Sequence, residues 1–111
     1  GGHTLREYEV TYIVRPDVDE EGLAAITARV EQVITSNGGR VIKADSWGKR
    51  RLAYPIRRYT EGYYTFLRTE LTDKAIREVE RQLKLSEDVF RHLLVRVEEA
   101  TEPAQQPQGT S

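Results

Sequence analysis

The 111-residue chain contains no cysteine and no methionine, and only two histidines. The absence of cysteine excludes disulfides and thiolate metal ligands. No apolar run approaches the ~18 residues that a membrane-spanning helix needs, and no secretory signal is present, so we expect a cytoplasmic protein without membrane contact. Because position 1 is glycine and not methionine, we expect residues 1–4 to be a remnant of cloning.

The patterns that usually mark an enzyme are missing as well. His92 has no second histidine close in sequence, which argues against a metal site. No Ser-His-Asp order or glycine-rich phosphate loop is present, and residues 15–18, which would follow the first strand, lack the glycines of a phosphate cradle. We therefore expect no catalytic activity, no cofactor, no metal and no small-molecule substrate.

Positive charge, by contrast, is concentrated in one segment. Residues 43–58 contain six of the chain's 17 Lys and Arg but one of its 18 Asp and Glu, a net charge of +5, so the remainder carries −6. Trp47, Tyr54 and Tyr59 lie within or next to this segment. Guanidinium groups beside aromatic rings suit RNA. The alternative is an edge strand whose charges prevent aggregation.

Hydrophobic periodicity predicts alternating strands and helices. Residues 8–14 alternate as a strand. Asp19 can cap a helix that Asn37-Gly38-Gly39 ends. A second strand should run over residues 40–56 with a bend at Gly48, and Pro55 places it at a sheet edge. We expect a turn over 57–61, a third strand over 62–69, a helix capped by Thr72 or Asp73, and a fourth strand over 89–98.

This order predicts an α+β, ferredoxin-like βαββαβ sandwich, in which a four-stranded antiparallel sheet carries both helices on one face. The domain should span residues 5–99, followed by a disordered tail over 100–111. The open sheet face should be lined by some of Glu9, Thr11, Ile13, Tyr63, Thr65 and Leu67, whereas Tyr64 and Phe66 are expected to pack in the core. Arg91 and Arg96 should lie on opposite faces of the fourth strand.

Two segments resemble a known family. The opening LREYEV at positions 5–10 and the run WGKRRLAYPI at positions 47–56 are similar to the start and the signature segment of bacterial small-subunit ribosomal protein S6. The resemblance extends in element order over residues 5–99. It implies a structural component of the small ribosomal subunit that pairs with ribosomal protein S18, the pair binding the central domain of the small-subunit rRNA.

The basic segment and this resemblance together nominate the interaction residues. The RNA-binding candidates are Arg6, Lys49, Arg50, Arg51, Arg57 and Arg58. The candidates for the protein-partner edge are Trp47, Arg50, Arg51 and Tyr54. The rings of Trp47 and Tyr54 could stack on bases or shield the base of the hairpin. The alternative function is a ferredoxin-like protein-interaction module that self-associates through its edge strand.

Overall fold

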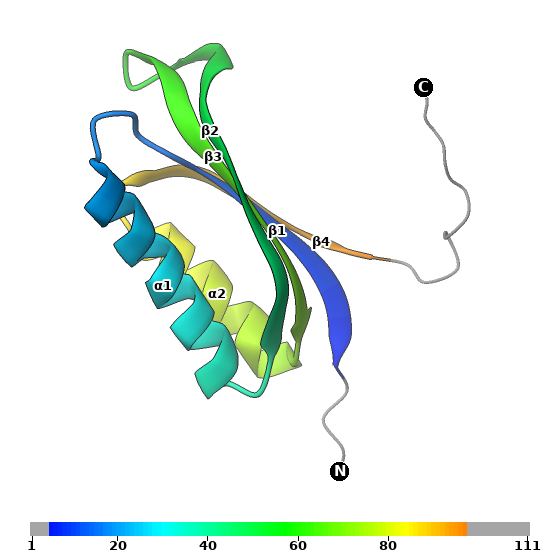
Figure 1. Cartoon of the computed structure of the whole chain (residues 1–111). Coiled ribbons are helices and arrows are strands. Elements are labelled where there is room, and N and C mark those ends of the chain that lie inside the picture. The colour runs from blue at the N-terminus through cyan, green and yellow to red at the C-terminus, as the bar shows by residue number, and fades with distance from the viewer. Residues whose placement is uncertain (1–4, 98–111) are drawn as a thin grey trace.

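The computed structural model describes residues 5–97. Its elements are β1 (Arg6–Val14), α1 (Glu20–Ser36), β2 (Arg40–Ile56), β3 (Tyr59–Leu71), α2 (Asp73–Leu85) and β4 (Val89–Arg96). Figure 1 shows α1 and α2 side by side against one face of a twisted sheet. The predicted ferredoxin-like α+β fold is confirmed. The predictions for residues 1–4 and 100–111 lie outside the described residues.

The sheet order is β2-β3-β1-β4, and every neighbouring pair is antiparallel. This order places β2 at one edge, as Pro55 predicted, and β4 at the other. Since β4 lies beside β1, the end of the described chain returns to its start, where the Val97 N–H donates to the Glu7 carbonyl at 2.9 Å.

The helices begin and end at the residues that the capping pattern predicted. The Asp19 carboxylate accepts from the Gly22 N–H at 2.8 Å, which satisfies one of the free donors of the first turn of α1. The Thr72 hydroxyl accepts from the Ala75 N–H at 3.0 Å and donates to the Asn37 carbonyl at 2.8 Å. Thr72 therefore caps α2 and also ties it to the end of α1.

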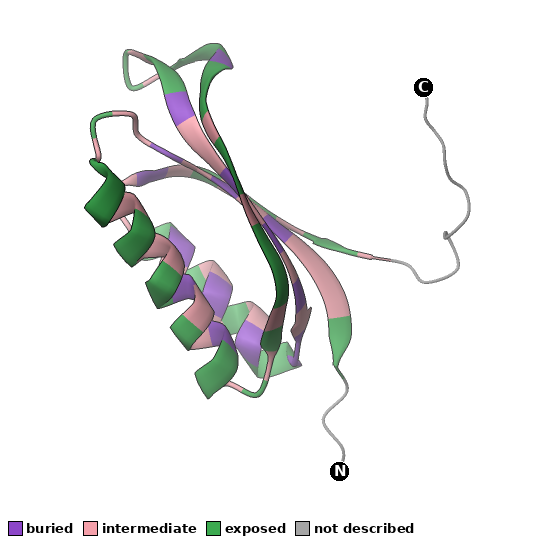
Figure 2. Cartoon of the chain, in the orientation of Figure 1, coloured by how far each residue is buried: buried purple, intermediate pink, exposed green. Residues whose placement is uncertain are grey.

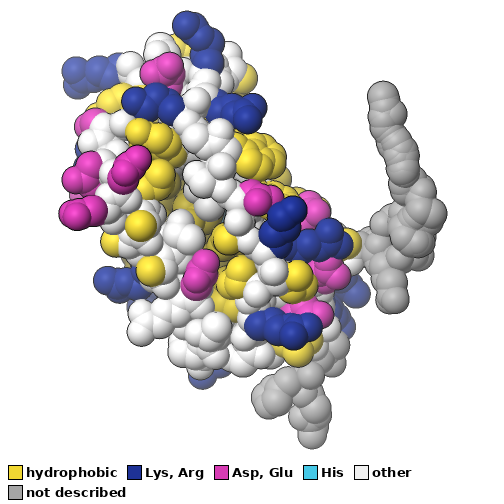
Figure 3. Space-filling model, viewed as in Figure 1, with side chains coloured by type: hydrophobic (Ala, Val, Ile, Leu, Met, Phe, Trp, Pro, Cys, Tyr) yellow, Lys and Arg dark blue, Asp and Glu magenta, His cyan; other side chains and the backbone are white. Residues whose placement is uncertain are grey.

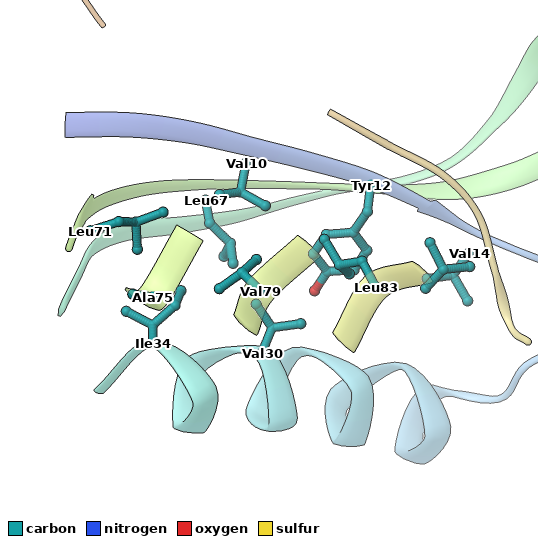
Figure 4. Close-up of a cluster of buried hydrophobic side chains, with 11 residues drawn as sticks. Val10, Tyr12, Val14, Val30, Ile34, Leu67, Leu71, Ala75, Val79 and Leu83 are labelled. Carbon is teal, nitrogen blue, oxygen red and sulfur yellow. The ribbon is translucent and has the colours of Figure 1, made fainter. Parts of the chain in front are cut away.

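The core lies between the helices and one face of the sheet. Figure 2 shows buried residues on the strands and on both helices, and Figure 4 shows that the buried side chains of β1 and β3 point toward those of α1 and α2. Burial of each large apolar side chain contributes about 1.5–3 kcal/mol. Tyr12 is fully buried, and its hydroxyl shares a hydrogen bond of 2.7 Å with the Thr27 hydroxyl. Burial raises the pKa of Tyr12. The fully buried apolar side chains are Val10, Tyr12, Val14, Val30, Ile34, Leu67, Leu71, Ala75, Val79 and Leu83.

The facing of β3 differs from the sequence-based expectation. Leu67 and Thr65 are buried and face the helices, so neither lines the open face, and Tyr63 packs against the core. Cross-strand partners share a face, and β1 residues Ile13 and Thr11 pair with Tyr64 and Phe66. Tyr64 and Phe66 therefore lie on the open face and not in the core. The reason is that register, not hydrophobicity, decides the facing of a strand with continuous large side chains.

Candidate RNA interface

The β2–β3 hairpin extends beyond the rest of the sheet and carries most of the nominated residues. In Figure 3, Lys and Arg side chains gather at the end of the molecule over this hairpin. All six RNA-binding candidates are exposed. Five of them, listed here, lie on the hairpin: Lys49, Arg50, Arg51, Arg57 and Arg58.

A β-bulge at Gly48 sets the direction of the basic segment. The register of β2 against β3 shifts between Ser46 and Gly48, which leaves Trp47 as the additional residue. Gly48 has φ of +81°, a conformation that glycine adopts at little cost. A Cβ at this position would meet no atom within 4 Å, so the backbone angle, not crowding, requires glycine here.

The bulge places the Trp47 ring on the open sheet face. The ring stacks over Phe66 and Tyr64, with centroid distances of 5.9 and 6.4 Å and interplanar angles of 10° and 11°. The Arg50 Nε–H donates to the Trp47 carbonyl at 3.2 Å, and the guanidinium carbon lies 5.8 Å from the Trp47 ring centroid. Trp47 still exposes 46% of its surface. Arg50 and Trp47 thus form one cationic and aromatic surface.

Lys49, Arg50 and Arg51 do not share a single face. The ammonium of Lys49 lies 5.4 Å from the ring centroid of Tyr63, on the side of the sheet that carries the helices. Since side chains alternate along a strand, Arg50 points to the open face, and Arg51, opposite Glu61, points away from it. The three cations therefore flank the hairpin on both sides.

The hairpin turn is tighter than expected. Ile56 pairs with Tyr59, so the turn consists of Arg57 and Arg58 alone, not of residues 57–61. Both residues have positive φ, +50° and +68°, which is the type I′ geometry of two-residue hairpin turns. The Arg57 Nη1–H donates to the Glu87 carbonyl at 3.1 Å.

The end of the hairpin packs against the start of β4. The guanidinium carbons of Arg57 and Arg91 lie 5.5 Å from the Phe90 ring and 5.1 Å from the Tyr54 ring. Arg91 pairs with Ile13 and so lies on the open face, whereas Arg96 pairs with Tyr8 on the helix face. The prediction that these two arginines lie on opposite faces is confirmed. Of the partner-edge candidates, Trp47, Arg50 and Tyr54 therefore occupy the open side of the sheet, whereas Arg51 does not.

Arg6 is separated from the other candidates. It begins β1 and pairs with Leu71, the last residue of β3, whereas the hairpin turn precedes Tyr59, the first residue of β3. At ~3.3 Å per residue, these two ends of β3 lie about 40 Å apart. Arg6 and the hairpin could touch one RNA only if that RNA followed the length of the sheet.

A hydrogen-bond network that the sequence did not predict connects the first residue of β3 with the segments that follow β1 and precede β4. The Arg15 guanidinium donates to the carboxylates of Asp88 at 2.7 Å and Asp17 at 3.1 Å, and the Tyr59 hydroxyl donates to Asp17 at 3.1 Å. The hydrogen bond with Asp88 is the main cause of a raised pKa for Arg15. Arg15 and Asp17 are neighbours in sequence, but Tyr59 and Asp88 are distant from them, so no local pattern could have indicated the network.

The nominated cations share one property. Within residues 5–97, none of the six forms an ion pair with a carboxylate. Among the described basic residues that were not nominated, an ion pair is formed by Arg15, Arg40, Lys43, Arg68 and Arg81 but not by Arg29, Lys74, Arg77, Lys84 or Arg91. Arg40 binds Glu70 at 2.7 Å, for example, and Arg68 binds Glu7. The six candidates therefore keep their charge uncompensated at close range.

Comparison with known proteins decides which family this geometry represents. Residues 7–96 match the family model described as Ribosomal protein S6. The chain belongs to the ribosomal protein S6 family. The resemblance noted from positions 5–10 and 47–56 is thereby confirmed. Members of the S6 family are structural components of the small ribosomal subunit and not enzymes.

Two individual S6 proteins illustrate the similarity. The small ribosomal subunit protein bS6 of Moorella thermoacetica is 44% identical over 95 residues, which cover 86% of this chain and 97% of that protein. The crystal structure of the 30S ribosomal protein S6 from Thermotoga maritima superposes with a TM-score of 0.79 at 27% identity, covering 85% of this chain and 89% of the other.

Two further properties of the described residues concern metal binding and membranes. Within residues 5–97, no three His, Asp or Glu side chains converge as a metal site would require. His92 instead faces Glu80 of α2, with 3.5 Å between Nε2 and Oε2. No helix in the same range is long and apolar enough to cross a membrane.

Proposed function

We propose that this protein binds the central domain of the small-subunit rRNA together with ribosomal protein S18, as a non-catalytic part of the cytoplasmic ribosome. Lys49, Arg50 and Arg51 contact phosphates along the hairpin, Arg57 and Arg58 do so at its turn, and Arg6 does so at the far end of the sheet. Phosphate contacts of this kind position a protein on RNA without reading its sequence.

The observation that supports this role most directly is that five exposed cations lie together on one hairpin, and that none of the five forms an ion pair within the described chain. A cation that already has a carboxylate partner must lose that partner, or share it, before it can neutralise a phosphate. Cations without such a partner bring their full charge to the RNA and release its counterions on binding. The alternative, in which these charges only prevent aggregation at the β2 edge, does not account for the cations at the turn.

The charge of the whole chain supports the proposal that RNA binding requires a partner. A formal net charge of −1 provides little long-range attraction to a polyanion, so binding to RNA alone should be weak. We place the S18 contact at Trp47, Arg50, Arg51 and Tyr54. Trp47 and Tyr54 expose 46% and 54% of their surface, and partly exposed aromatic rings are typical anchors of protein interfaces.

The test is a filter-binding titration of a central-domain rRNA fragment with and without S18, over a series of salt concentrations. We expect tight binding only with S18. Replacing Lys49, Arg50 and Arg51 together by Ala should lower the affinity. It should also make the slope of log affinity against log salt shallower, by the equivalent of up to about three phosphate contacts. Equal affinity with and without S18 would refute the partner requirement.

A charge-matched variant controls for the loss of three cations. Arg77, Arg81 and Lys84 are exposed on α2, in the helix layer away from the hairpin, and alanine favours the helix there. Their triple Ala variant should bind RNA and S18 nearly as the wild type does. If both triple variants lose affinity equally, the hairpin has no special role and net charge alone explains the binding.

Self-association through β2 is the alternative hypothesis. The pairing of β2 with β3 is irregular at three positions, near Val41, Trp47 and the end of the hairpin, and bulges of this kind twist an edge strand away from further pairing. Sedimentation velocity of the purified protein distinguishes the two cases. A monomer at micromolar concentration fits the ribosomal role, whereas a stable dimer favours the alternative.

A further inference from the structure

The hairpin turn uses residues that its backbone geometry disfavours. A type I′ turn needs positive φ at both central positions, and Asn-Gly is the usual pair because these residues adopt it at little cost. Here both positions are arginine, with φ of +50° and +68°. At Gly48, nine residues earlier, the same chain places glycine where φ is positive. The arginines at the turn therefore require a reason other than backbone geometry.

Contacts within the molecule explain Arg57 but not Arg58. Arg57 donates to the Glu87 carbonyl at 3.1 Å and lies over the Phe90 ring at 5.5 Å, so it fastens the turn to the start of β4. Arg58 is exposed and makes no hydrogen bond, ion pair or ring contact with any residue in the described part of the chain. Its unfavourable backbone conformation is thus not offset by any contact of its own side chain.

Arg58 also borders a hollow. An open depression of about 760 Å³ lies beside the turn and is lined by Arg15, Arg57, Arg58, Tyr59 and Glu87. Asp17 and Asp88 already hold the Arg15 guanidinium, and the Glu87 carbonyl holds Arg57. Of these three guanidinium groups, only that of Arg58 has no partner among residues 5–97.

We propose that Arg58 is a phosphate anchor: the turn places it beside this depression, where its guanidinium receives a phosphodiester of the bound RNA. A guanidinium matches two oxygens of one phosphate with two parallel hydrogen bonds. Glu87 also lines the depression, and its negative charge opposes the binding of a phosphate there. The inference rests on the proposed RNA-binding function and specifies one contact of it.

Three variants separate backbone strain from charge. Arg58→Gly relieves the strain and removes the cation, but glycine also increases the freedom of the unfolded chain, which offsets part of the gain. The melting temperature should therefore rise by up to about 4–8 °C. Affinity for the rRNA fragment in the presence of S18 should fall about tenfold, and the slope of log affinity against log salt should decrease by about one. Arg58→Lys keeps the strain and the charge, so it should melt as the wild type does and retain the salt slope. Arg77→Ala, on α2, should alter neither quantity.

The outcomes are decisive in each direction. If Arg58→Gly binds the rRNA fragment as tightly as the wild type, Arg58 is not an anchor, although the ribosomal function can stand. If Arg58→Gly is less stable than the wild type, the strain argument is wrong. If the wild type with S18 does not bind the fragment at all, the proposed function is wrong. The assignment of Arg58 is then wrong as well, whatever the melting temperatures show. Glu87→Gln, which keeps the carbonyl that holds Arg57, should tighten binding.

Discussion

Replacing Gly48 by L-alanine should destabilise the protein, whereas replacing it by D-alanine should not. Gly48 has φ of +81°, and a Cβ built there meets no atom within 4 Å. The energetic difference between the two variants therefore comes from backbone conformation alone. A left-handed conformation costs an L-residue about 1–2 kcal/mol, and the mirror-image residue adopts it without that cost.

The magnitude follows from two opposing contributions. Either alanine reduces the freedom of the unfolded chain relative to glycine, which stabilises the fold by about 0.4–1 kcal/mol. For D-alanine this gain remains, while for L-alanine the conformational cost outweighs it or cancels it. The two variants should thus differ by about 1–2 kcal/mol in the free energy of unfolding, and each 1 kcal/mol corresponds to about 4–8 °C in melting temperature for a domain of this size.

The assay is thermal unfolding of the two synthetic variants, followed by circular dichroism and by the fluorescence of Trp47, the single tryptophan of the chain. Gly62→Ala is the contrasting control, since a Cβ there would lie 2.6 Å from Cγ2 of Ile13 and 3.1 Å from the Val14 carbonyl. That variant should be destabilised by steric overlap. Equal melting temperatures for L- and D-alanine at position 48 would show that the bulge does not depend on positive φ.

Two further predictions concern the core. Leu67→Ala should lower the free energy of unfolding by about 2–5 kcal/mol in a urea titration, whereas Leu93→Ala, at a side chain that is 60% exposed, should cost less than about 1 kcal/mol; similar losses would contradict the assigned register. The raised pKa of Tyr12 keeps its phenol neutral in the folded state, so stability should fall as pH rises above about 10, where the unfolded tyrosine ionises. Tyr12→Phe should show a shallower alkaline loss in the same titration.

The order of elements was predictable from sequence because each boundary has a local cause. The cap residues Asp19 and Thr72 and the breaker Gly38 act within a few positions of themselves. Pro55 likewise indicates an edge strand without reference to any neighbour. The effect of such residues on the backbone does not depend on the tertiary contacts that form around them.

The facing of β3 was not predicted because aromatic and aliphatic side chains surround Thr65 on both sides, from Tyr63 to Leu67, and so occupy both faces of the strand. The alternation needed to assign the faces begins only beyond this run, where Arg68 and Glu70 lie on the same side as Tyr64 and Phe66. Extending the pattern to those charged residues would have placed Leu67 in the core. The stack of Trp47 on Phe66 depends in addition on a bulge, whose register no single segment reveals.

The candidate cations could be nominated from sequence, but their grouping could not. Clustering along the chain suggested one basic patch, whereas strand alternation separates Arg50 from Lys49 and the length of β3 separates Arg6 from the hairpin. The two-residue turn was also missed, because arginine is not a residue that the type I′ pattern leads one to expect.

The hydrogen bond between Val97 and Glu7 has a consequence for how the chain may be reconnected. The two ends of the folded domain adjoin at one end of the sheet, while Arg57 and Arg58 lie at the other. A short linker between these ends would close the chain into a ring, and new termini opened at the turn would leave all four strands and both helices intact. The architecture thus permits the order of its segments to be permuted while their packing is preserved.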